Sequence, residues 1–223
     1  MKEPFLYLNF ILPAWLEPYP HVTYMWLTMI LLLAIAYFTI RRLQLLPGPG
    51  QTLMELVVGG ILGFMERVMG HHAKQHLPII GGIVLFIVTA NLLGIIPGLF
   101  SATANINITA GCALTIFLYY QYIGFRRHGL AYIKHFTGPV WWLAPLMLPI
   151  ELISHFIRPF TLALRLFANM HGHEIVLIIL TLLVPIVAPL PIVFLGIFVS
   201  FIQGFVFMLL SMIYIAGAEE EHH

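Results

Sequence analysis

The sequence is poor in charged residues, lacks aspartate and contains a single cysteine. Charged side chains make up 9% of the 223 residues, against about 25% in a typical soluble domain, and 61% of the residues are hydrophobic. So few charges cannot cover a water-soluble globule, which indicates a membrane protein. A net charge of +1 excludes a broad basic face that binds nucleic acid. Cys112 alone cannot form a disulfide within the chain, and no Cys/His metal spacing occurs, so we expect no metal or cofactor.

The uncharged stretches predict an all-α integral membrane protein with about five membrane-crossing helices plus interfacial helices. An apolar run of about 20 residues crosses a bilayer as a helix, whereas shorter apolar runs lie at the interface or re-enter. Residues 1–223 are expected to form a single membrane domain. Its expected segments are a first span at 22–43, an interfacial amphipathic segment at 51–71, a helical hairpin at 77–125, a short interfacial segment at 139–149 and a long, tilted helical hairpin at 150–216.

The distribution of lysine and arginine predicts the orientation of the chain, because basic residues near helix ends are retained on the cytoplasmic side. With five spans and the N-terminus outside, Lys2 alone falls outside, and Arg158 and Arg165 fall within a span. All the other basic residues then lie in the cytoplasm. The C-terminus is cytoplasmic in this arrangement, and we interpret its run of glutamates and histidines as a solvated tail rather than a metal site.

The expected helix at 150–182 is unusual because charged side chains lie inside it. At 100° per residue, several polar residues fall within about 40° of Arg165 and form one stripe, whereas Glu174 falls on the opposite side. Glu151 lies about 21 Å before Arg165 and Glu174 about 13 Å after it along the axis, so neither neutralises the arginine directly. The stripe consists of Glu151, Ser154, Arg158, Arg165 and Asn169.

A charged side chain at the middle of a bilayer costs a few kcal/mol or more, so it normally faces protein or water. No carboxylate of this chain falls at the depth of Arg165, which favours a partner carboxylate on another subunit. The alternative is that the two arginines extend to an interface or bond helix-end carbonyls. We prefer that alternative for Arg158, near the cytoplasmic end, and place the partner hypothesis ahead of it for Arg165.

Two stretches near the C-terminus resemble subunit a of the F-type ATP synthase membrane sector. Residues 158–174, RPFTLALRLFANMHGHE, are similar to the signature helix of that family. The stretch from Phe201, FIQGFVFMLLSMIYIAGAEEEH, is similar to its C-terminal helix, with Gln203 at the matching polar position. Residues 91–98, NLLGIIPG, resemble its hairpin turn less specifically. Residues 1–75 match the family only in general layout.

The resemblance implies a stator subunit beside a rotating ring of c subunits, in contact with lipid. It also implies a peripheral stalk of b subunits and the rest of the ATP synthase as partners, and ion translocation rather than catalysis on ATP by this chain. In that family the arginine at the position of Arg165 faces the ion-binding carboxylates of the ring. Ions reach those carboxylates through two offset half-channels. Arg165 would then release protons from the ring and block a direct leak between the half-channels.

The resemblance further implies two groups of residues along the proton path. Glutamate and histidine side chains can relay protons, and amides can hold water. For His171 and His173, a simple interfacial position is nearly as well supported as a relay, and Gln203 is a candidate for holding Arg165 in place. The outer half-channel would be lined by Glu174, Asn169, His171, His173 and Gln203, and the cytoplasmic half-channel by Glu151, Ser154 and His155.

The sequence departs from the family pattern near the outer half-channel. Some bacterial relatives carry a polar or ionisable side chain two turns before the glutamine of the last helix, where this chain has Gly196. The segment before Glu174 carries two histidines, which many relatives lack. The asparagines at 91, 105 and 107 are expected to cap helices or satisfy the hairpin turn rather than conduct ions.

Two other functions compete with this interpretation. A self-contained secondary transporter or channel could use Arg165 to bind a small anion, but internal repeats, which are common in transporters, are not evident. An intramembrane hydrolase is remote, because the segment from His173 begins like HExxH but ends in Leu177. A bacterial plasma membrane is the expected location, with a thylakoid membrane less favoured, because the start of the chain does not resemble an Arg- and Ser-rich transit peptide.

Overall fold

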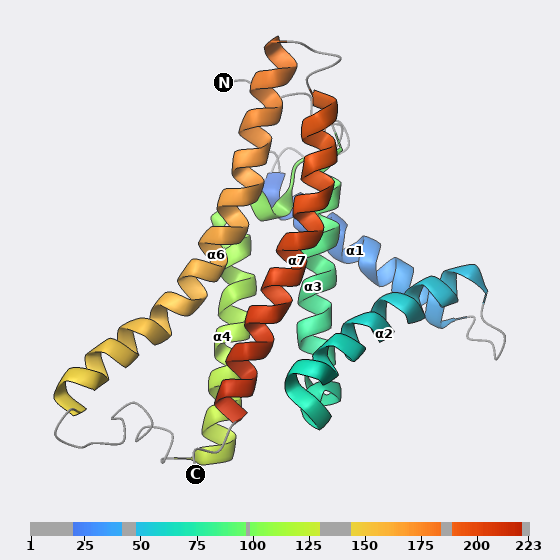
Figure 1. Ribbon diagram of the computed structural model, residues 1–223. Coiled ribbons are helices and arrows are strands. Elements are labelled where there is room, and N and C mark those ends of the chain that lie inside the picture. Colours follow the sequence, from blue (N-terminus) through green and yellow to red (C-terminus); the bar gives the residue numbers. More distant parts are fainter. Residues whose placement is uncertain (1–19, 42–47, 97–98, 130–143, 184–188, 220–223) are drawn as a thin grey trace.

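The computed structural model describes residues 20–41, 48–96, 99–129, 144–183 and 189–219 (Figure 1), and in these ranges it contains helices and no strands. Five helices are long and apolar enough to cross a membrane, which confirms the predicted class of an all-α integral membrane protein. The elements in chain order are α1 (Pro20–Ile40), α2 (Pro49–Met69), η2 (Gly70–His72), α3 (Ala73–Ile95), η3 (Ala102–Ala104), α4 (Ile106–His128), α6 (Ala144–Leu183) and α7 (Pro189–Glu219).

Local sequence explains where several helices begin and end. Pro49 lies in the first turn of α2, where its missing N–H is no loss, and Gly70 follows the last residue with φ 64°. Gly129 ends α4 in the same way with φ 54°, a conformation that favours glycine. At the other end of α4, the side chain of Asn105 accepts a hydrogen bond from the backbone N–H of Asn107 at 2.9 Å. This cap confirms the role expected for Asn105.

The core lies where α3, α4 and α7 pack together. Its buried side chains include Ile80 from α3, Tyr120 from α4, and Met212 and Ile215 from α7. A second cluster joins α6 to the same helices through Leu162 and Leu166. These contacts hold the middle of α6 against the hairpin formed by α3 and α4.

The helices α6 and α7 are much longer than a single crossing requires. They contain 40 and 31 residues, which at 1.5 Å per residue corresponds to about 60 Å and about 46 Å, against a hydrocarbon core of about 30 Å. Both therefore require a steep tilt. Figure 1 shows the two helices converging at one end, near the 183–189 connection, and diverging at the other.

The start of α6 differs from the sequence expectation. Residues 144–149, which the sequence assigned to a separate interfacial segment, belong to α6, and residues 139–143 lie outside the described part of the chain. The helix continues through Pro149 and Pro159. A proline removes one backbone hydrogen bond and favours a kink, so α6 lacks one helical hydrogen bond at each of these two positions.

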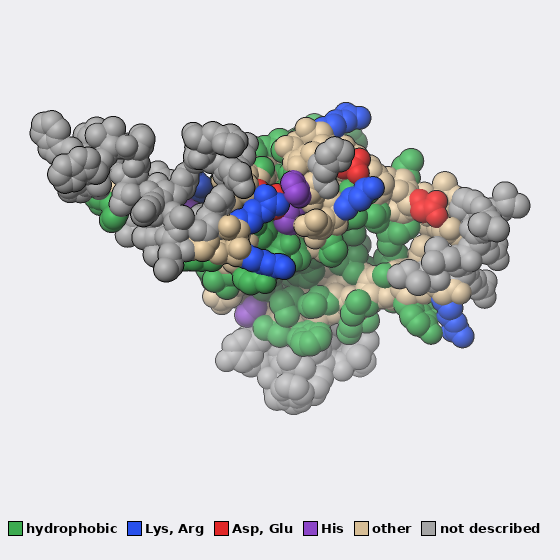
Figure 2. All heavy atoms as spheres, turned by 90° about the horizontal axis from the view of Figure 1, so that it is seen from below, with side chains coloured by type: hydrophobic (Ala, Val, Ile, Leu, Met, Phe, Trp, Pro, Cys, Tyr) green, Lys and Arg blue, Asp and Glu red, His purple; other side chains and the backbone are tan. Residues whose placement is uncertain are grey.

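One end of the bundle, which we call the basic end, carries Arg67, Lys74, Arg126 and Arg127 at or near helix ends. The contacts of Arg127 with Glu219 and His72 bring the end of α4, the end of α7 and the η2 turn before α3 together there. Figure 2, seen from below Figure 1, shows lysine and arginine side chains gathered on this face around histidines. These basic side chains therefore lie together at one end of the helical bundle.

At the opposite end of α3, the hairpin turn depends on a close approach between Gly94 and Ser101. A Cβ at position 94 would lie 2.2 Å from the Cβ of Ser101 and 2.7 Å from its backbone Cα. Only glycine allows this contact. The approach places the Ser101 hydroxyl 2.8 Å from that of Thr103, which in turn donates a hydrogen bond to the Asn91 side chain. All three residues are buried.

We expect Gly94→Ala to destabilise the protein by about 1–3 kcal/mol, because the new methyl group meets backbone that cannot rotate away. Thermal unfolding of the purified chain in detergent measures the change. Gly82→Ala, in the same helix but facing open space, is the matched control and should be neutral or slightly stabilising. Equal stability of the two variants would contradict this account of the turn.

Candidate functional site

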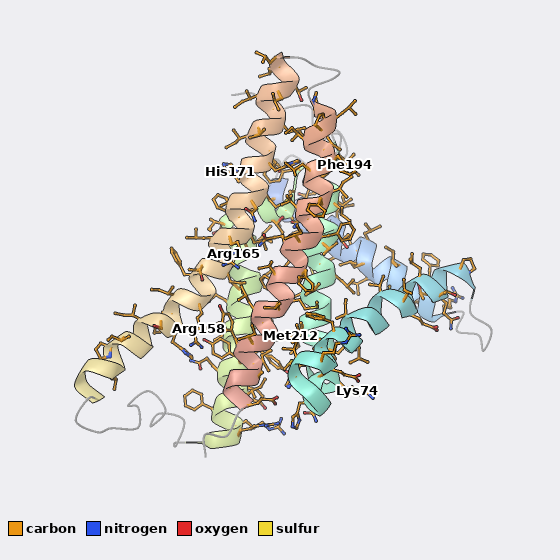
Figure 3. The ribbon with its side chains drawn as sticks, in the orientation of Figure 1. Lys74, Arg158, Arg165, His171, Phe194 and Met212 are labelled. Carbon is orange, nitrogen blue, oxygen red and sulfur yellow. The ribbon has the colours of Figure 1, made fainter. Side chains whose placement is uncertain are left out.

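The polar stripe predicted on one face of α6 follows the helix through the middle of the molecule. Figure 3 shows Arg158, Arg165 and His171 following one another along α6. The Arg158 guanidinium lies over the ring of Tyr214 in α7, 5.5 Å from its centroid. This contact lies near the divergent ends of the two helices, and it is a cation–π contact rather than the bond to helix-end carbonyls that the sequence offered for Arg158.

Arg165 lies near the middle of the candidate span Leu148–Leu183, and its side chain is exposed. Its neighbours Leu162 and Leu166 are buried in the core, so the backbone at Arg165 is fixed while its side chain points outward. Within the described ranges, the guanidinium takes part in no ion pair or hydrogen bond. This chain therefore presents a positive charge on its own surface at membrane depth.

The amides of Asn169 and Gln203 join α6 to α7 one turn beyond Arg165. The Nδ2 atom of Asn169 donates a hydrogen bond to Oε1 of Gln203. Gln203 is 3% exposed, and its Nε2 is buried without a hydrogen-bond partner among the described residues. The sequence suggested Gln203 as a contact of Arg165, but the structure places the Gln203 amide against Asn169.

Glu174 lies on the other side of α6, as the helical geometry predicted, and faces the hairpin turn. Its Oε1 accepts a hydrogen bond from the backbone N–H of Ser101 at 3.1 Å. The buried Ser101–Thr103–Asn91 chain thus begins directly beside this carboxylate. The sequence analysis missed Ser101 and Thr103, although a polar run inside an otherwise apolar hairpin was a usable signal.

The two histidines before Glu174 lie in different surroundings. His171 is exposed and stacks on Phe167, with ring centroids 5.1 Å apart. His173 is half-buried against α7, and its ring fills the space beside Gly196, where a Cβ would lie 2.4 Å from its Cε1. The two departures from the family pattern, an extra histidine and a missing side chain, are therefore in direct contact.

Toward the basic end, the stripe continues to Ser154 and His155. Ser154 is half-buried, whereas His155 is 6% exposed and packs on the Tyr120 ring with centroids 5.1 Å apart. Glu151 lies in α6, but its side chain is outside the described part of the structure. The ring contacts place His155 between α6 and α4 rather than on the open face.

The groups along α6 include ionisable side chains and amides, which are the groups that can relay protons or hold water. In the described ranges, no group of three His, Cys, Asp or Glu side chains gathers within coordinating reach. The ionisable and amide groups fall into two clusters along α6, one around Glu174 and Gln203 and the other around Ser154 and His155. Arg165 lies between them, on the outward face.

We expect Gly196→Ala to displace the His173 ring and to destabilise the protein by about 1–3 kcal/mol. The added methyl group would fall within 2.4 Å of that ring. His173→Gly should restore most of the loss when combined with Gly196→Ala, so thermal unfolding of the single and double variants measures the coupling. Gly172→Ala, which faces open space, is the control. A loss that His173→Gly does not relieve would refute the contact.

The sequence matches the family described as ATP synthase A chain over residues 22–216. Similar proteins include ATP synthase subunit a 3 of Pelobacter propionicus, 48% identical over 230 residues, and ATP synthase subunit a of Geobacter sulfurreducens, 46% identical over 230 residues. ATP synthase subunit a 1 of Syntrophotalea carbinolica is 48% identical over 234 residues. Each comparison covers 100% of both chains. The chain therefore belongs to the ATP synthase subunit a family, and it is an ion-translocating, non-catalytic membrane subunit of that complex.

Proposed function

We propose that Arg165 is the point at which carboxylates of a rotating c-subunit ring release their protons, and that two offset aqueous half-channels lead to it. In this proposal the chain is the stator, and ion flow past Arg165 drives ring rotation and ATP synthesis. The single observation that carries it is the Arg165 guanidinium in the middle of the span Leu148–Leu183, which is exposed and has no partner among the described residues.

The position of Arg165 requires a partner from outside the chain. An arginine exposed to hydrocarbon is costly, and the cost falls when the charge meets a carboxylate or water. The acids of its own helix lie far along the axis, and Glu174 faces the hairpin turn instead. A ring carboxylate that arrives opposite Arg165 supplies the missing negative charge once per step.

The same charge accounts for proton release and for the absence of a leak. A nearby cation favours the ionised form of a carboxylate, so an arriving carboxylic acid gives up its proton. A fixed positive charge also repels a proton that would pass directly between the half-channels. One proton that crosses a potential of 100 mV yields about 2.3 kcal/mol, so several are needed for each ATP, and rotation accumulates their work.

The outer half-channel would be lined by Glu174, His173, Asn169 and Gln203, with His171 at its mouth. Glu174 supports this role because it is half-buried between α6 and the hairpin turn, where it accepts a hydrogen bond from the backbone N–H of Ser101. The Nε2 atoms of Gln203 and His173 are buried and have no hydrogen-bond partner in the described ranges, so water in such a channel would satisfy the Gln203 donor and the His173 ring nitrogen.

The second half-channel would lie toward the basic end and include Ser154, His155 and Glu151. Ser154 and His155 lie toward the divergent ends of α6 and α7 in Figure 1, on the other side of Arg165 from Glu174 along α6. We assign this end to the cytoplasm of a bacterium and the N-terminus to the outer side of its plasma membrane. In this proposal the exposed apolar faces of α1 and α2 contact lipid and the b-subunit stalk.

We expect Arg165→Ala to abolish proton-driven ATP synthesis and ATP-driven pumping in membranes that contain the whole complex, because the ring carboxylates lose their counter-charge. Arg158→Ala is the matched variant on the same helix and should retain most coupled pumping, since the Arg158 head group lies over Tyr214 instead of facing outward. ATP synthesis and acridine-dye quenching measure the two activities. Normal coupling in the Arg165 variant would refute the proposal.

We also expect cysteines at positions 174 and 154 to be reached by water from opposite sides of the membrane. Each is introduced separately after Cys112→Ala removes the native thiol, and membrane-impermeant methanethiosulfonate is applied to right-side-out or inverted vesicles. Glu174→Cys should react from the outer side and Ser154→Cys from the inner side. Leu166→Cys, in the buried core, is the unreactive control. Reaction of both test positions from one side would contradict two offset channels.

A further inference from the structure

A cavity of about 400 Å³ lies at the basic end, between the start of α3, the end of α4 and the end of α7. The proton path proposed above does not use it. Its polar lining is formed by Gln75, His76, Tyr119, Arg126, Arg127 and Glu219, and Tyr122 borders it as well.

The one carboxylate in this lining is already fully engaged. Glu219 Oε1 lies 3.0 Å from Nη2 of Arg127 and 3.2 Å from Nε2 of His76. The other ring nitrogen of His76 lies 3.0 Å from the hydroxyl of Tyr119. A neutral imidazole satisfies both bonds when Nε2 carries the hydrogen. The side chain of Glu219 is only 9% exposed, and Arg127 balances its charge. We call this set of contacts among Glu219, Arg127, His76 and Tyr119, which joins the ends of α3, α4 and α7, the Glu219 clasp.

Arg126 is the charge that remains. It lines the same cavity, its side chain is exposed, and within the described ranges it takes part in no ion pair or hydrogen bond. With Glu219 balanced by Arg127, Arg126 is the positive charge among the described lining residues that has no acidic partner. The amide of Gln75 and the hydroxyl of Tyr122 add hydrogen-bond donors beside Arg126. This donor set suits a singly charged anion that has only acceptor oxygens, such as a phosphodiester.

The cavity lies at the depth of lipid headgroups. The candidate span of α4 ends at Arg127, that of α3 begins at Ala73 and that of α7 ends at Glu219. The ends of three spanning helices mark the boundary between hydrocarbon and headgroups, and basic pockets at this boundary attract anionic lipids.

An apolar ridge on α4 leads from the cavity into the hydrocarbon depth. Leu114, Leu118, Tyr122 and Phe125 are spaced four, four and three residues apart, so they share one face of the helix. Their exposed fractions are 51%, 65%, 58% and 48%. Tyr122 belongs both to this ridge and to the rim of the cavity. Acyl chains attached to a phosphate in the cavity would lie along this ridge, whereas a free anion would make no contact with it.

We propose that this cavity binds the phosphate group of an anionic phospholipid, with Arg126 as its principal contact and the acyl chains along the α4 ridge. The bound lipid fills the space beside the Glu219 clasp and so braces the ends of α3, α4 and α7. This site is independent of Arg165, and its failure would leave the proposed proton path unaffected.

The test measures phospholipid binding by the purified, delipidated complex in neutral detergent. Phosphatidylglycerol and phosphatidylcholine are added back separately, and bound lipid is counted by native mass spectrometry. We expect one phosphatidylglycerol per complex whose affinity falls about five-fold in Arg126→Gln, which corresponds to about 1 kcal/mol for one basic residue at the membrane surface. Arg126→Lys keeps the charge and should retain most of the affinity. Lys74→Gln, which removes a basic residue at the same end outside the cavity, should bind like the parent.

A variant on the α4 ridge tests the acyl-chain contact separately from the headgroup contact. Leu118→Asn leaves every charge of the cavity in place and should weaken retention of the intact lipid. Identical binding in the parent and in both Arg126→Gln and Leu118→Asn would overturn the proposal. Equal affinity for phosphatidylcholine and phosphatidylglycerol would also overturn the proposal. Binding of inorganic phosphate at about 10 mM, with no binding of either lipid, would indicate a site for a free anion and would overturn it as well.

Discussion

The functional account depends on one positive charge, the Arg165 guanidinium, which is held at the middle of a membrane-spanning helix and is not neutralised by any residue in the described part of the chain. Leu162 and Leu166 anchor α6 in the core on either side of Arg165, so the guanidinium faces outward and has no described partner. Such a charge is costly in hydrocarbon. Its cost is met in the assembled complex if ring carboxylates pass in front of it, and the same interaction then does the work of releasing protons.

The rest of the site follows from how two long helices cross a short hairpin. The lengths of α6 and α7 require a tilt, and the tilt separates the Glu174 cluster from the Ser154 and His155 cluster both along and around the molecule. Two close contacts, each made possible by a glycine, position the cluster around Glu174. Gly94 allows Ser101 to reach Glu174, and Gly196 makes room for His173. These groups, which we assign to the proton path, are therefore held by packing so tight that one added methyl group at either glycine would disturb it.

Composition and periodicity predicted the helical membrane class, and the charged stripe on α6 was predictable because helical geometry alone sets which residues share a face. The opposite orientation of Glu174 followed from the same geometry. Contacts between distant segments were not predictable in this way. The bond from Ser101 to Glu174, the Asn169–Gln203 pair and the His173–Gly196 contact depend on how helices pack. The continuation of α6 from Ala144 through Pro149 was not predicted either, because a proline usually ends or kinks a helix and the sequence therefore placed the start of the span after it.

The most direct test of the central claim is a density map of the intact complex at a resolution that shows side chains. The account predicts that the Arg165 guanidinium faces the ring and lies within ion-pair or single-water distance of a ring carboxylate, with Glu174 and Ser154 bordering separate aqueous cavities on either side. A map in which Arg165 pairs with a carboxylate of its own chain, while the ring contacts another face, would contradict it.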